Sequence, residues 1–286
     1  MPRTKLIINP NANLGRAAAA AQALLPALAG PAGELEWTMT TGPGHAVELA
    51  RQAADQGSEL VIAGGGDGTT HEVLNGLMQT PPERRPRLGV VPLGSGNDFA
   101  HAVGIDPQPA AALRQALTGD PHRVDVAQLT DSLGRVEYFG NTLGIGFDAT
   151  VTLRSRQFRA LRGFLIYLAA VTQTILLNHE AVSMRVESDR EQFSQQMVML
   201  VLCNGGREGG GFRVSPASRP DDGVMEYAAV GKVSRPRMFR LLPEVMRGTH
   251  ARFKDVRMGQ FQRLSIQADQ RLYIHVDGEI FAGWGT

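Results

Sequence analysis

The chain contains few cysteines and no long apolar run. Only one of its 286 residues is a cysteine, Cys203, and it ends an apolar run that starts at residue 197. A single thiol excludes an internal disulfide framework and is typical of a reducing compartment, where we expect Cys203 to be a small core residue. The first apolar run, residues 6–8, is too short for the hydrophobic region of a signal peptide. The uncharged, largely apolar stretch at residues 163–178 is too short and too polar to span a bilayer. We therefore expect a cytoplasmic protein that is at most peripherally associated with a membrane.

The chain also has almost no net charge and few lysines. The formal net charge is +1, which provides no general reason to expect nucleic acid as a partner. Lysine occurs only at positions 5, 232 and 254. What the chain has is length, 43% hydrophobic residues and 33 glycines, a composition typical of a globular, turn-rich protein that is long enough for two domains.

The two halves of the chain have different patterns. Up to residue 118, apolar strand patterns alternate with helical patterns, which predicts an α/β domain with a parallel sheet covered on both faces. From residue 122 onward strands predominate, which predicts a mainly antiparallel sheet or β-sandwich. We therefore predict two domains, residues 1–121 and 122–286, packed against each other with a cleft between them. The expected strands are 5–8, 34–39, 61–63, 88–92, 123–129, 136–142, 182–188, 195–203, 224–230, 264–268 and 272–276, and the expected helices are 17–28, 46–56, 110–117 and 164–177.

A glycine-rich loop at residues 64–69 is the most informative feature of the first half. The strand at residues 61–63 leads into Gly64, Gly65, Gly66, Asp67, Gly68 and Thr69, and a helical pattern follows. Consecutive glycines let the backbone approach phosphate oxygens closely, and N–H groups at a helix start attract anions. The P-loop and dinucleotide-binding patterns are both absent. The carboxylate of Asp67 suits a site in which Mg²⁺ or a sugar hydroxyl lies between it and phosphate. The alternative is an ordinary strand-to-helix turn with Asp67 as N-cap.

A second glycine-rich loop follows the next strand. Residues 93–100 include Gly94, Ser95, Gly96, Asn97 and Asp98, and either of the last two is expected to cap a helix. Two such loops after successive parallel strands should lie side by side at the carboxyl edge of one sheet, where α/β folds bind ligands. We expect Asn9 and Pro10 at the same edge, although Asn9 could equally be only a turn residue.

With so few lysines, a triphosphate bound at these loops would be neutralised mainly by backbone N–H groups, helix N-termini and Mg²⁺, with Arg16 as a possible helper.

Two motifs in the second half have more than one interpretation. Asp221 and Asp222, after the glycine-rich segment 205–211, form either a hydrated turn, which spacing favours, or a site for a hard cation. Asp277 and Gly278 lie between apolar strands and predict a hairpin, in which Glu279 is simply the first residue of the return strand.

Two segments combine arginine with apolar residues. Four arginines between residues 154 and 162 precede the apolar stretch 164–177, and eight Lys or Arg residues between 232 and 257 alternate with apolar residues. This combination suits an anionic membrane surface. Core-facing helices with solvated arginines are an equally good interpretation.

Taken together, the motifs resemble the diacylglycerol kinase catalytic-domain family, and within it the bacterial lipid kinases related to sphingosine kinases. The resemblance rests on Gly-Gly-Asp-Gly-Thr at 65–69 with Glu72, Pro-Leu-Gly-Ser-Gly-Asn-Asp-Phe-Ala at 92–100, Asn9-Pro10, the segment 141–148, Asn204-Gly205, the segment 216–223, and Asp277-Gly278-Glu279. It implies a phosphofructokinase-like α/β domain, a C-terminal β-sandwich, and ATP- and Mg²⁺-dependent phosphorylation of a lipid hydroxyl. The acceptor, diacylglycerol-like or sphingoid-like, and the oligomeric state, monomer or homodimer, stay open.

The resemblance also assigns roles to individual residues. It implies that Glu279 is the general base and that Asp67 and Asp98 organise metal and phosphate. It implies a structural Mg²⁺ at Asp222 with the backbone carbonyls of Arg219 and Val224. The residues implied to bind nucleotide are Asn9, Pro10, Thr40, Gly64, Gly65, Gly66, Asp67, Gly68, Thr69, Glu72, Gly94, Ser95 and Asn97. The family usually has serine and glycine after Asn-Pro, but this chain has the segment 11–15, so its first phosphate loop is expected to be displaced by a residue or two.

Two other functions are compatible with the residues. A soluble small-molecule kinase of the NAD-kinase or phosphofructokinase type shares the Gly-Gly-Asp-Gly loop. The other is a non-catalytic nucleotide-binding module, which would use the two glycine-rich loops and have no general base.

Overall fold

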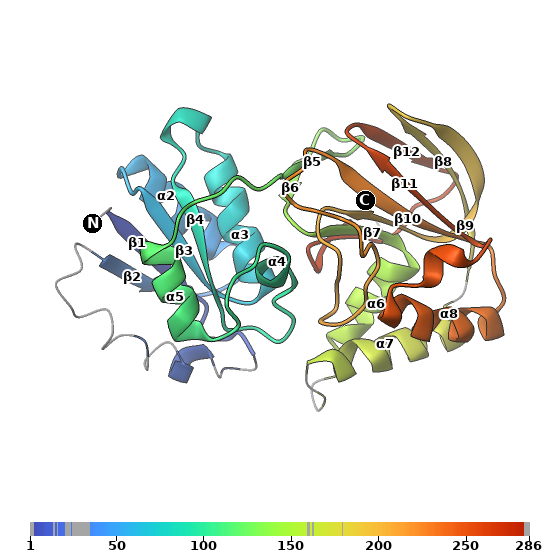
Figure 1. Ribbon diagram of the computed structural model, residues 1–286, viewed down its shortest axis with the longest axis horizontal. Helices are drawn as coiled ribbons and strands as arrows, with labels where there is room; N and C mark the ends of the chain where they lie inside the picture. Colours follow the sequence, from blue (N-terminus) through green and yellow to red (C-terminus); the bar gives the residue numbers. More distant parts are fainter. Residues whose placement is uncertain are drawn as a thin grey trace. The chain divides into compact units, whose positions relative to one another are not determined.

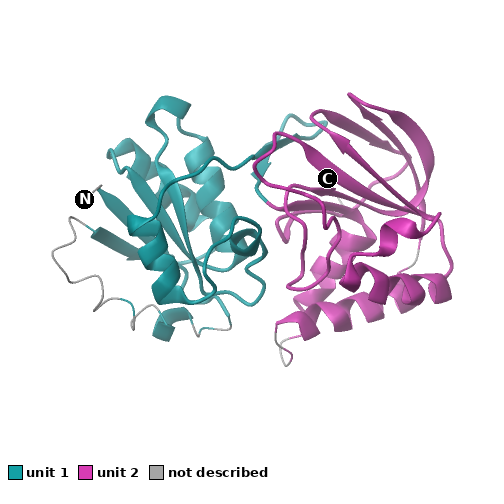
Figure 2. Ribbon diagram, viewed as in Figure 1, with its two compact units in different colours: residues 1–140 teal, residues 141–286 magenta. Residues whose placement is uncertain are grey.

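The computed structural model describes residues 3–13, 15, 17–20, 24, 35–158, 161, 163–178 and 180–282. The chain forms two compact units, residues 1–140 and 141–286, shown in Figure 2. The domain boundary that we predicted between residues 121 and 122 stays a prediction. Most of the predicted helix 17–28 and Arg16 lie outside the described residues.

The first unit is built on a four-stranded parallel sheet in the order β2-β1-β3-β4 (Figure 1). Its strands are β1 (Thr4–Ile8), β2 (Leu35–Met39), β3 (Leu60–Gly65) and β4 (Arg87–Pro92). Its helices are α2 (His45–Asp55), α3 (Asp67–Met78), α4 (Asp98–Ala102) and α5 (Pro109–Thr118), with a short 3₁₀ turn η1 (Pro82–Arg84). The predicted α/β domain with a parallel sheet is confirmed.

Side chains of the parallel strands point alternately to two cores. Ile7 and Val61 pack with α2 and α3 on one face. Leu6 and Ile62 pack on the other face with Leu113 of α5. The sheet is therefore covered on both faces, as the near-continuous apolar strands predict.

A hairpin of β5 (Ala127–Thr130) and β6 (Val136–Phe139) completes the first unit. It is joined to α3 because Asn75 pairs with the backbone of Tyr138 through two hydrogen bonds of 2.9 Å. The predicted strand 136–142 is in fact the end of this hairpin and the start of the next strand. It is interrupted at Gly140, whose backbone packs so closely on the ring of Phe99 that a Cβ there would lie 2.5 Å from it.

The second unit is built on an antiparallel sheet that forks at its longest strand, β9 (Gln192–Cys203). One edge of β9 pairs with β10, and the other edge pairs with β8 along its first half and β7 along its second half. The remaining pairs are β10 with β11, β8 with β12, β7 with β13, and β13 with β14. The strands are β7 (Thr142–Gly146), β8 (Val182–Ser188), β10 (Met225–Gly231), β11 (Val256–Phe261), β12 (Leu264–Ala268), β13 (Ile274–Val276) and β14 (Glu279–Ala282). The predicted antiparallel C-terminal domain is confirmed.

Among the described residues, the helices that cover the core of the second unit are α6 (Phe147–Ser155), α7 (Phe164–Leu177) and α8 (Arg235–Arg247), with a 3₁₀ turn η2 (His250–Arg252). Their buried side chains pack on the sheet residues Val201 and Cys203. Burial raises the pKa of the Cys203 thiol well above its usual range, and the nearby carboxylates of Glu208 and Asp148 act in the same direction. Cys203 is thus a core residue, as expected. Among the described helices, none has the length and hydropathy that crossing a bilayer requires.

Candidate functional site

The two glycine-rich loops lie side by side. The N–H of Leu93 donates to the carbonyl of Gly65 at 2.7 Å. A Cβ placed on Gly94 would lie 2.4 Å from the Cα of Gly66, so the two loops touch through bare backbone. The neighbouring strands β3 and β4 end here, which places both loops at the carboxyl edge of the parallel sheet (Figure 1). This confirms the predicted adjacency and explains why position 94 requires glycine.

Asp67 connects one loop to the other. Gly66 occupies the N-cap position and Asp67 is the first residue of α3, so the simpler interpretation of Asp67 as N-cap is wrong. Its Oδ1 instead accepts a hydrogen bond of 3.1 Å from the N–H of Phe99, in the second loop's helix. Asn97, in the left-handed conformation at φ 53°, folds its side-chain amide back onto Gly94, donating to its carbonyl and accepting from its N–H. The second loop is therefore held by its own side chain.

Two carboxylates flank the bare backbone of Gly96. A Cβ on this glycine would lie 2.8 Å from Oδ2 of Asp67 and 3.4 Å from Oδ2 of Asp98. Asp98 is buried, with 5% of its surface exposed. Carboxylate oxygens are the donors that Mg²⁺ prefers, so these residues fit the cation that the resemblance implies.

Asn9 joins the first strand to the first loop. Its N–H donates to the carbonyl of Gly64 at 2.9 Å, and its Nδ2 donates to Oγ1 of Thr69 at 3.1 Å. Its Oδ1 accepts from the N–H of Asn11, which makes the turn through Pro10. Thr40, at the end of β2, is buried and donates its N–H to Ile8 at 2.8 Å. The ends of β1, β2 and β3 thus meet as predicted, and nucleotide binding by these residues stays a prediction.

Glu72 and Ser95 have different surroundings. Both oxygens of Glu72 accept hydrogen bonds at the start of α2, from the N–H groups of Gly44 at 2.9 Å and Ala46 at 3.1 Å. The carboxylate therefore anchors the start of α2 beside α3. Nucleotide binding by Glu72 stays a prediction. Ser95 is exposed at the tip of the second loop.

In the second unit, the Asp277-Gly278 turn presents Glu279. Both turn residues have positive φ, 49° and 84°, the signature of a type I′ hairpin between β13 and β14. Oδ1 of Asp277 accepts from the N–H groups of Asn141 at 2.9 Å and Thr142 at 3.0 Å. The Glu279 side chain is 49% exposed, and its Oε2 lies 2.8 Å from the guanidinium of Arg156. The hairpin prediction is confirmed, and its return strand begins with an accessible carboxylate.

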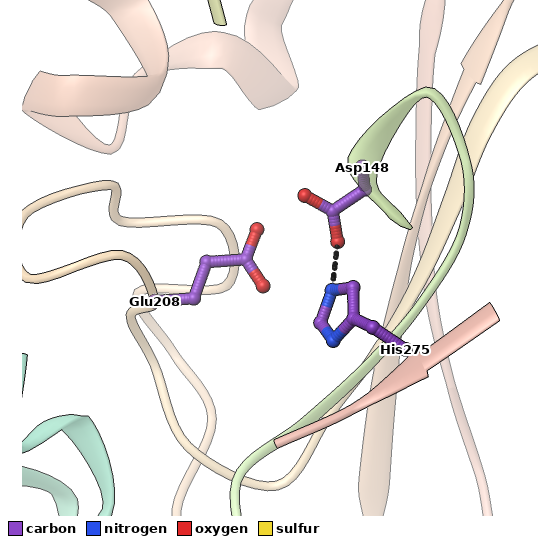
Figure 3. A group of neighbouring side chains, drawn as sticks. All are labelled: Asp148, Glu208 and His275. Atoms are coloured by element: carbon purple, nitrogen blue, oxygen red, sulfur yellow. Dashed lines mark hydrogen bonds and ion pairs between the residues drawn. The ribbon is translucent and has the colours of Figure 1, made fainter. Parts of the chain in front are cut away.

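A buried imidazole lies beside this turn (Figure 3). His275 of β13 has 3% of its surface exposed, and its Nε2 is 2.7 Å from Oδ2 of Asp148, at the start of α6. A Cβ on Gly144 would lie 1.9 Å from that oxygen and 2.3 Å from that nitrogen, so the pair exists because position 144 has no side chain. The carboxylate of Glu208 lies nearby, and one ligand atom from each of the three residues lies within 4.8 Å of the others. One imidazole and two carboxylates also suit a divalent cation.

The sequence reasoning did not find this cluster. Its members are far apart in the chain, and its only local signals were a glycine four residues before Asp148 and a histidine two residues before Asp277.

The predicted Mg²⁺ site in the 219–224 turn has an exposed setting. Oδ1 of Asp222 accepts from the N–H of Val224 at 3.1 Å, and Arg219 pairs with Asp221 at 3.3 Å. These contacts describe a polar surface turn, and cation binding there stays a prediction.

Most of the chain matches known protein families. Residues 3–129 match the family model of the diacylglycerol kinase catalytic domain, and residues 141–285 match that of the YegS C-terminal NAD kinase beta sandwich-like domain. The chain belongs to the diacylglycerol kinase catalytic-domain family. It is 34% identical over 238 residues to a Chromohalobacter salexigens protein named "Probable lipid kinase YegS-like", covering 82% of this chain and 74% of that one. It is 28% identical over 243 residues to a diacylglycerol kinase of Bacillus subtilis, covering 84% and 77%.

The fold is also found in solved structures. A crystal structure of a candidate diacylglycerol kinase from Bacillus anthracis str. Sterne has a TM-score of 0.79 at 24% identity, covering 97% of this chain and 90% of that one. Another, of a diacylglycerol kinase from the same organism, has a TM-score of 0.72 at 20% identity, covering 96% and 89%. These matches show that the chain has the fold of those structures.

In this family member, α7 carries an apolar groove on its surface. The groove has a volume of about 520 Å³, and its walls include Phe158, Leu161, Leu165, Leu168 and Leu176. Leu165 and Leu176 are 56% and 53% exposed, which is unusual for side chains of this size.

Several of the arginines predicted to contact a membrane pair within the protein. Arg237 lies 2.6 Å from Asp255, and Arg252 lies 2.7 Å from Glu244. Met238 and Leu241 of α8 are buried in the core. Arg159 and Arg162 lie outside the described residues. The structure thus shows a core-facing α8, while membrane contact is left to experiment.

Proposed function

We propose that this protein is an ATP- and Mg²⁺-dependent lipid kinase that transfers the γ-phosphoryl group to the hydroxyl of a diacylglycerol-like or sphingoid-like acceptor. The observation that carries the proposal is the pair of touching glycine loops with the carboxylates of Asp67 and Asp98 beside Gly96, in a chain of the diacylglycerol kinase family. A bare backbone that ends in two carboxylates can bind phosphate only with a cation between them, which is the chemistry of a phosphotransferase.

The chain's own residues would bind the nucleotide mainly through backbone groups. None of its three lysines lies in either loop. N–H groups of the loops and the N-terminus of α3 would therefore hold the phosphates, while the Asn9–Thr69 hydrogen bond fixes the loop wall. Mg²⁺, held by Asp67 and Asp98, would supply neutralisation of the charge that develops on the phosphates.

Glu279 is our proposed general base. An alcohol must lose its proton as it attacks the γ-phosphorus, and a carboxylate within hydrogen-bond reach of the hydroxyl can accept it. Glu279 is half-exposed at the start of β14, so an incoming hydroxyl can reach it. Transfer requires that this carboxylate and the loop-bound phosphate reach the same acceptor.

The apolar groove on α7 is our proposed contact for the acyl or alkyl chain of the acceptor. Ligand pockets of this size are commonly lined by apolar side chains. The exposed leucines of α7 also suit peripheral contact with a membrane, which would bring the enzyme to a substrate that stays in the bilayer.

The test is a radiolabelled-ATP assay with and without Mg²⁺, over a panel of diacylglycerol, sphingosine and ceramide in anionic vesicles, with NAD and fructose 6-phosphate as soluble acceptors. We expect Mg²⁺-dependent labelling of a lipid. Labelling of a soluble acceptor in the absence of vesicles would support an NAD-kinase or phosphofructokinase type instead. ATP binding without any labelled product would support a non-catalytic module.

Replacing Leu165 by glutamine is expected to raise the apparent KM for the lipid about tenfold and leave the KM for ATP unchanged, because removing an apolar contact costs about 1–2 kcal/mol. Leu133→Gln is the matched control, because Leu133 is 70% exposed on the β5–β6 hairpin of the first unit. Steady-state kinetics with vesicles would measure both. If the two variants had the same apparent KM for the lipid, the groove would not be part of the lipid-binding site.

A further inference from the structure

His275 connects the buried Asp148 to the turn that presents Glu279. Its Nε2 lies 2.7 Å from Oδ2 of Asp148, and its Nδ1 accepts a hydrogen bond of 3.3 Å from the N–H of Gly278. Gly278 is the residue directly before Glu279. One imidazole therefore contacts both Asp148, as Figure 3 shows, and the backbone of the turn.

The contacts determine which ring nitrogen carries the proton. A backbone N–H can only donate, so Nδ1 of His275 must be the acceptor for Gly278. In the neutral ring the proton is then on Nε2, which donates it to Asp148. The carboxylate of Asp148 thus orients the ring so that Nδ1 points at the turn.

This arrangement favours a positioning role over binding of a cation by His275. Both ring nitrogens are engaged within the protein, and a cation would have to displace the contact with Asp148. Gly144 leaves the space that the pair occupies, because any Cβ there would overlap both partners. The local backbone is therefore shaped to hold the hydrogen-bonded pair.

The turn makes two other sets of contacts, one with the backbone of the second unit and one with the exposed side chain of Arg156. Asp277 is tied to the start of β7 through Asn141 and Thr142. Arg156 contacts the carbonyl of Gly278 at 3.4 Å and the carboxylate of Glu279 at 2.8 Å, but both side chains are about half exposed, where ion pairs are weak. The hydrogen bond from Gly278 to His275 is partly buried and holds the turn at the residue directly before Glu279.

We propose that His275 is a positioning residue for Glu279, acting through the N–H of Gly278; this rests on the proposed role of Glu279 as base. Without that hydrogen bond the turn can tilt, and a base displaced by about 1 Å can lose about 100-fold in rate. The acceptor lipid and ATP would bind as before, so the effect should appear in kcat and not in KM.

Two substitutions separate the contacts of His275. In His275→Asn the amide oxygen lies where Nδ1 was and can accept from Gly278, but the side chain is too short to reach Asp148. In His275→Gln the amide nitrogen lies near the position of Nε2 and can donate to Asp148, but the acceptor for Gly278 is lost. Both variants keep a polar, hydrogen-bonded side chain in the buried site.

The experiment is steady-state kinetics on the full chain, with the lipid that the acceptor panel identifies, for wild type, His275→Asn, His275→Gln, Glu279→Gln and the double variant His275→Gln/Glu279→Gln. We expect His275→Gln to lower kcat about 10- to 100-fold with each KM changed by less than about twofold. His275→Asn should stay within about threefold of wild type, as rescue by the variant that keeps the turn contact. The double variant should be no slower than Glu279→Gln alone, because displacing residue 279 cannot slow the reaction further once its carboxylate has been removed.

Other outcomes would overturn the proposal. Equal losses in His275→Asn and His275→Gln, accompanied by equal falls in melting temperature, would show a purely structural role. Wild-type kcat in His275→Gln together with an inactive Glu279→Gln would reject the positioning role and keep the base. Wild-type activity in Glu279→Gln would reject the base itself, and the positioning role with it.

Discussion

Replacing Glu279 by glutamine is expected to lower kcat by about 1,000-fold, within the range that general-base catalysis contributes. Glutamine has the same shape and can still accept a hydrogen bond from Arg156, so the β13–β14 hairpin should keep its structure. It cannot accept the proton of the attacking hydroxyl. ATP should bind with unchanged affinity, because Glu279 is proposed to act on the acceptor hydroxyl and the residues proposed to bind ATP are unchanged.

The measurement is single-turnover phosphorylation with radiolabelled ATP, together with ATP binding by calorimetry. Glu187→Gln is the matched control: Glu187 lies in the same unit, on β8, is 41% exposed, and pairs with Arg185 as Glu279 pairs with Arg156. We expect the control to retain full activity. A Glu279→Gln enzyme within tenfold of wild type would assign the proton transfer to another group.

Replacing Asp67 by asparagine is expected to lower kcat/KM for MgATP about 100-fold, equivalent to about 3 kcal/mol. Asparagine can still accept from the N–H of Phe99, so the contact between the loops should survive. It removes one of the two negative charges beside Gly96, and with it part of the attraction for Mg²⁺. The loss should be partly relieved as Mg²⁺ concentration rises.

A Mg²⁺ titration of the rate, with thermal unfolding as a check on folding, would measure this effect. Asp106→Asn is the control in the same unit, because Asp106 also accepts one backbone N–H, from Gln108 at 2.8 Å, and lies outside both loops. If Asp67→Asn and Asp106→Asn showed the same Mg²⁺ dependence, Asp67 would not be the metal-organising carboxylate.

Short-range features of the sequence predicted their own structures well. The glycines at 64–66 and at 94 and 96, each group after an apolar strand, indicated two loops at one sheet edge because parallel strands have a common carboxyl edge. The Asp277-Gly278 pair indicated a type I′ turn because both residues tolerate positive φ. Periodicity likewise separated the α/β half from the antiparallel half, since these signals act within a few residues.

Other features depended on contacts between distant residues, which periodicity does not encode. The alternative interpretation of the first loop made Asp67 a helix cap, but in the folded chain its carboxylate accepts a hydrogen bond from Phe99 in the other loop. Glu72 belongs to the glycine-loop motif, yet its oxygens anchor the start of α2.

The sequence by itself determined the two sheet types, the paired glycine loops and the turn that presents Glu279, because each arises from backbone preferences of adjacent residues. Only the tertiary structure decided that His275 connects Asp148 to that turn. The two side chains are 127 positions apart. They meet because the register between β7 and β13 places His275 opposite Gly144, where the missing side chain leaves space for both.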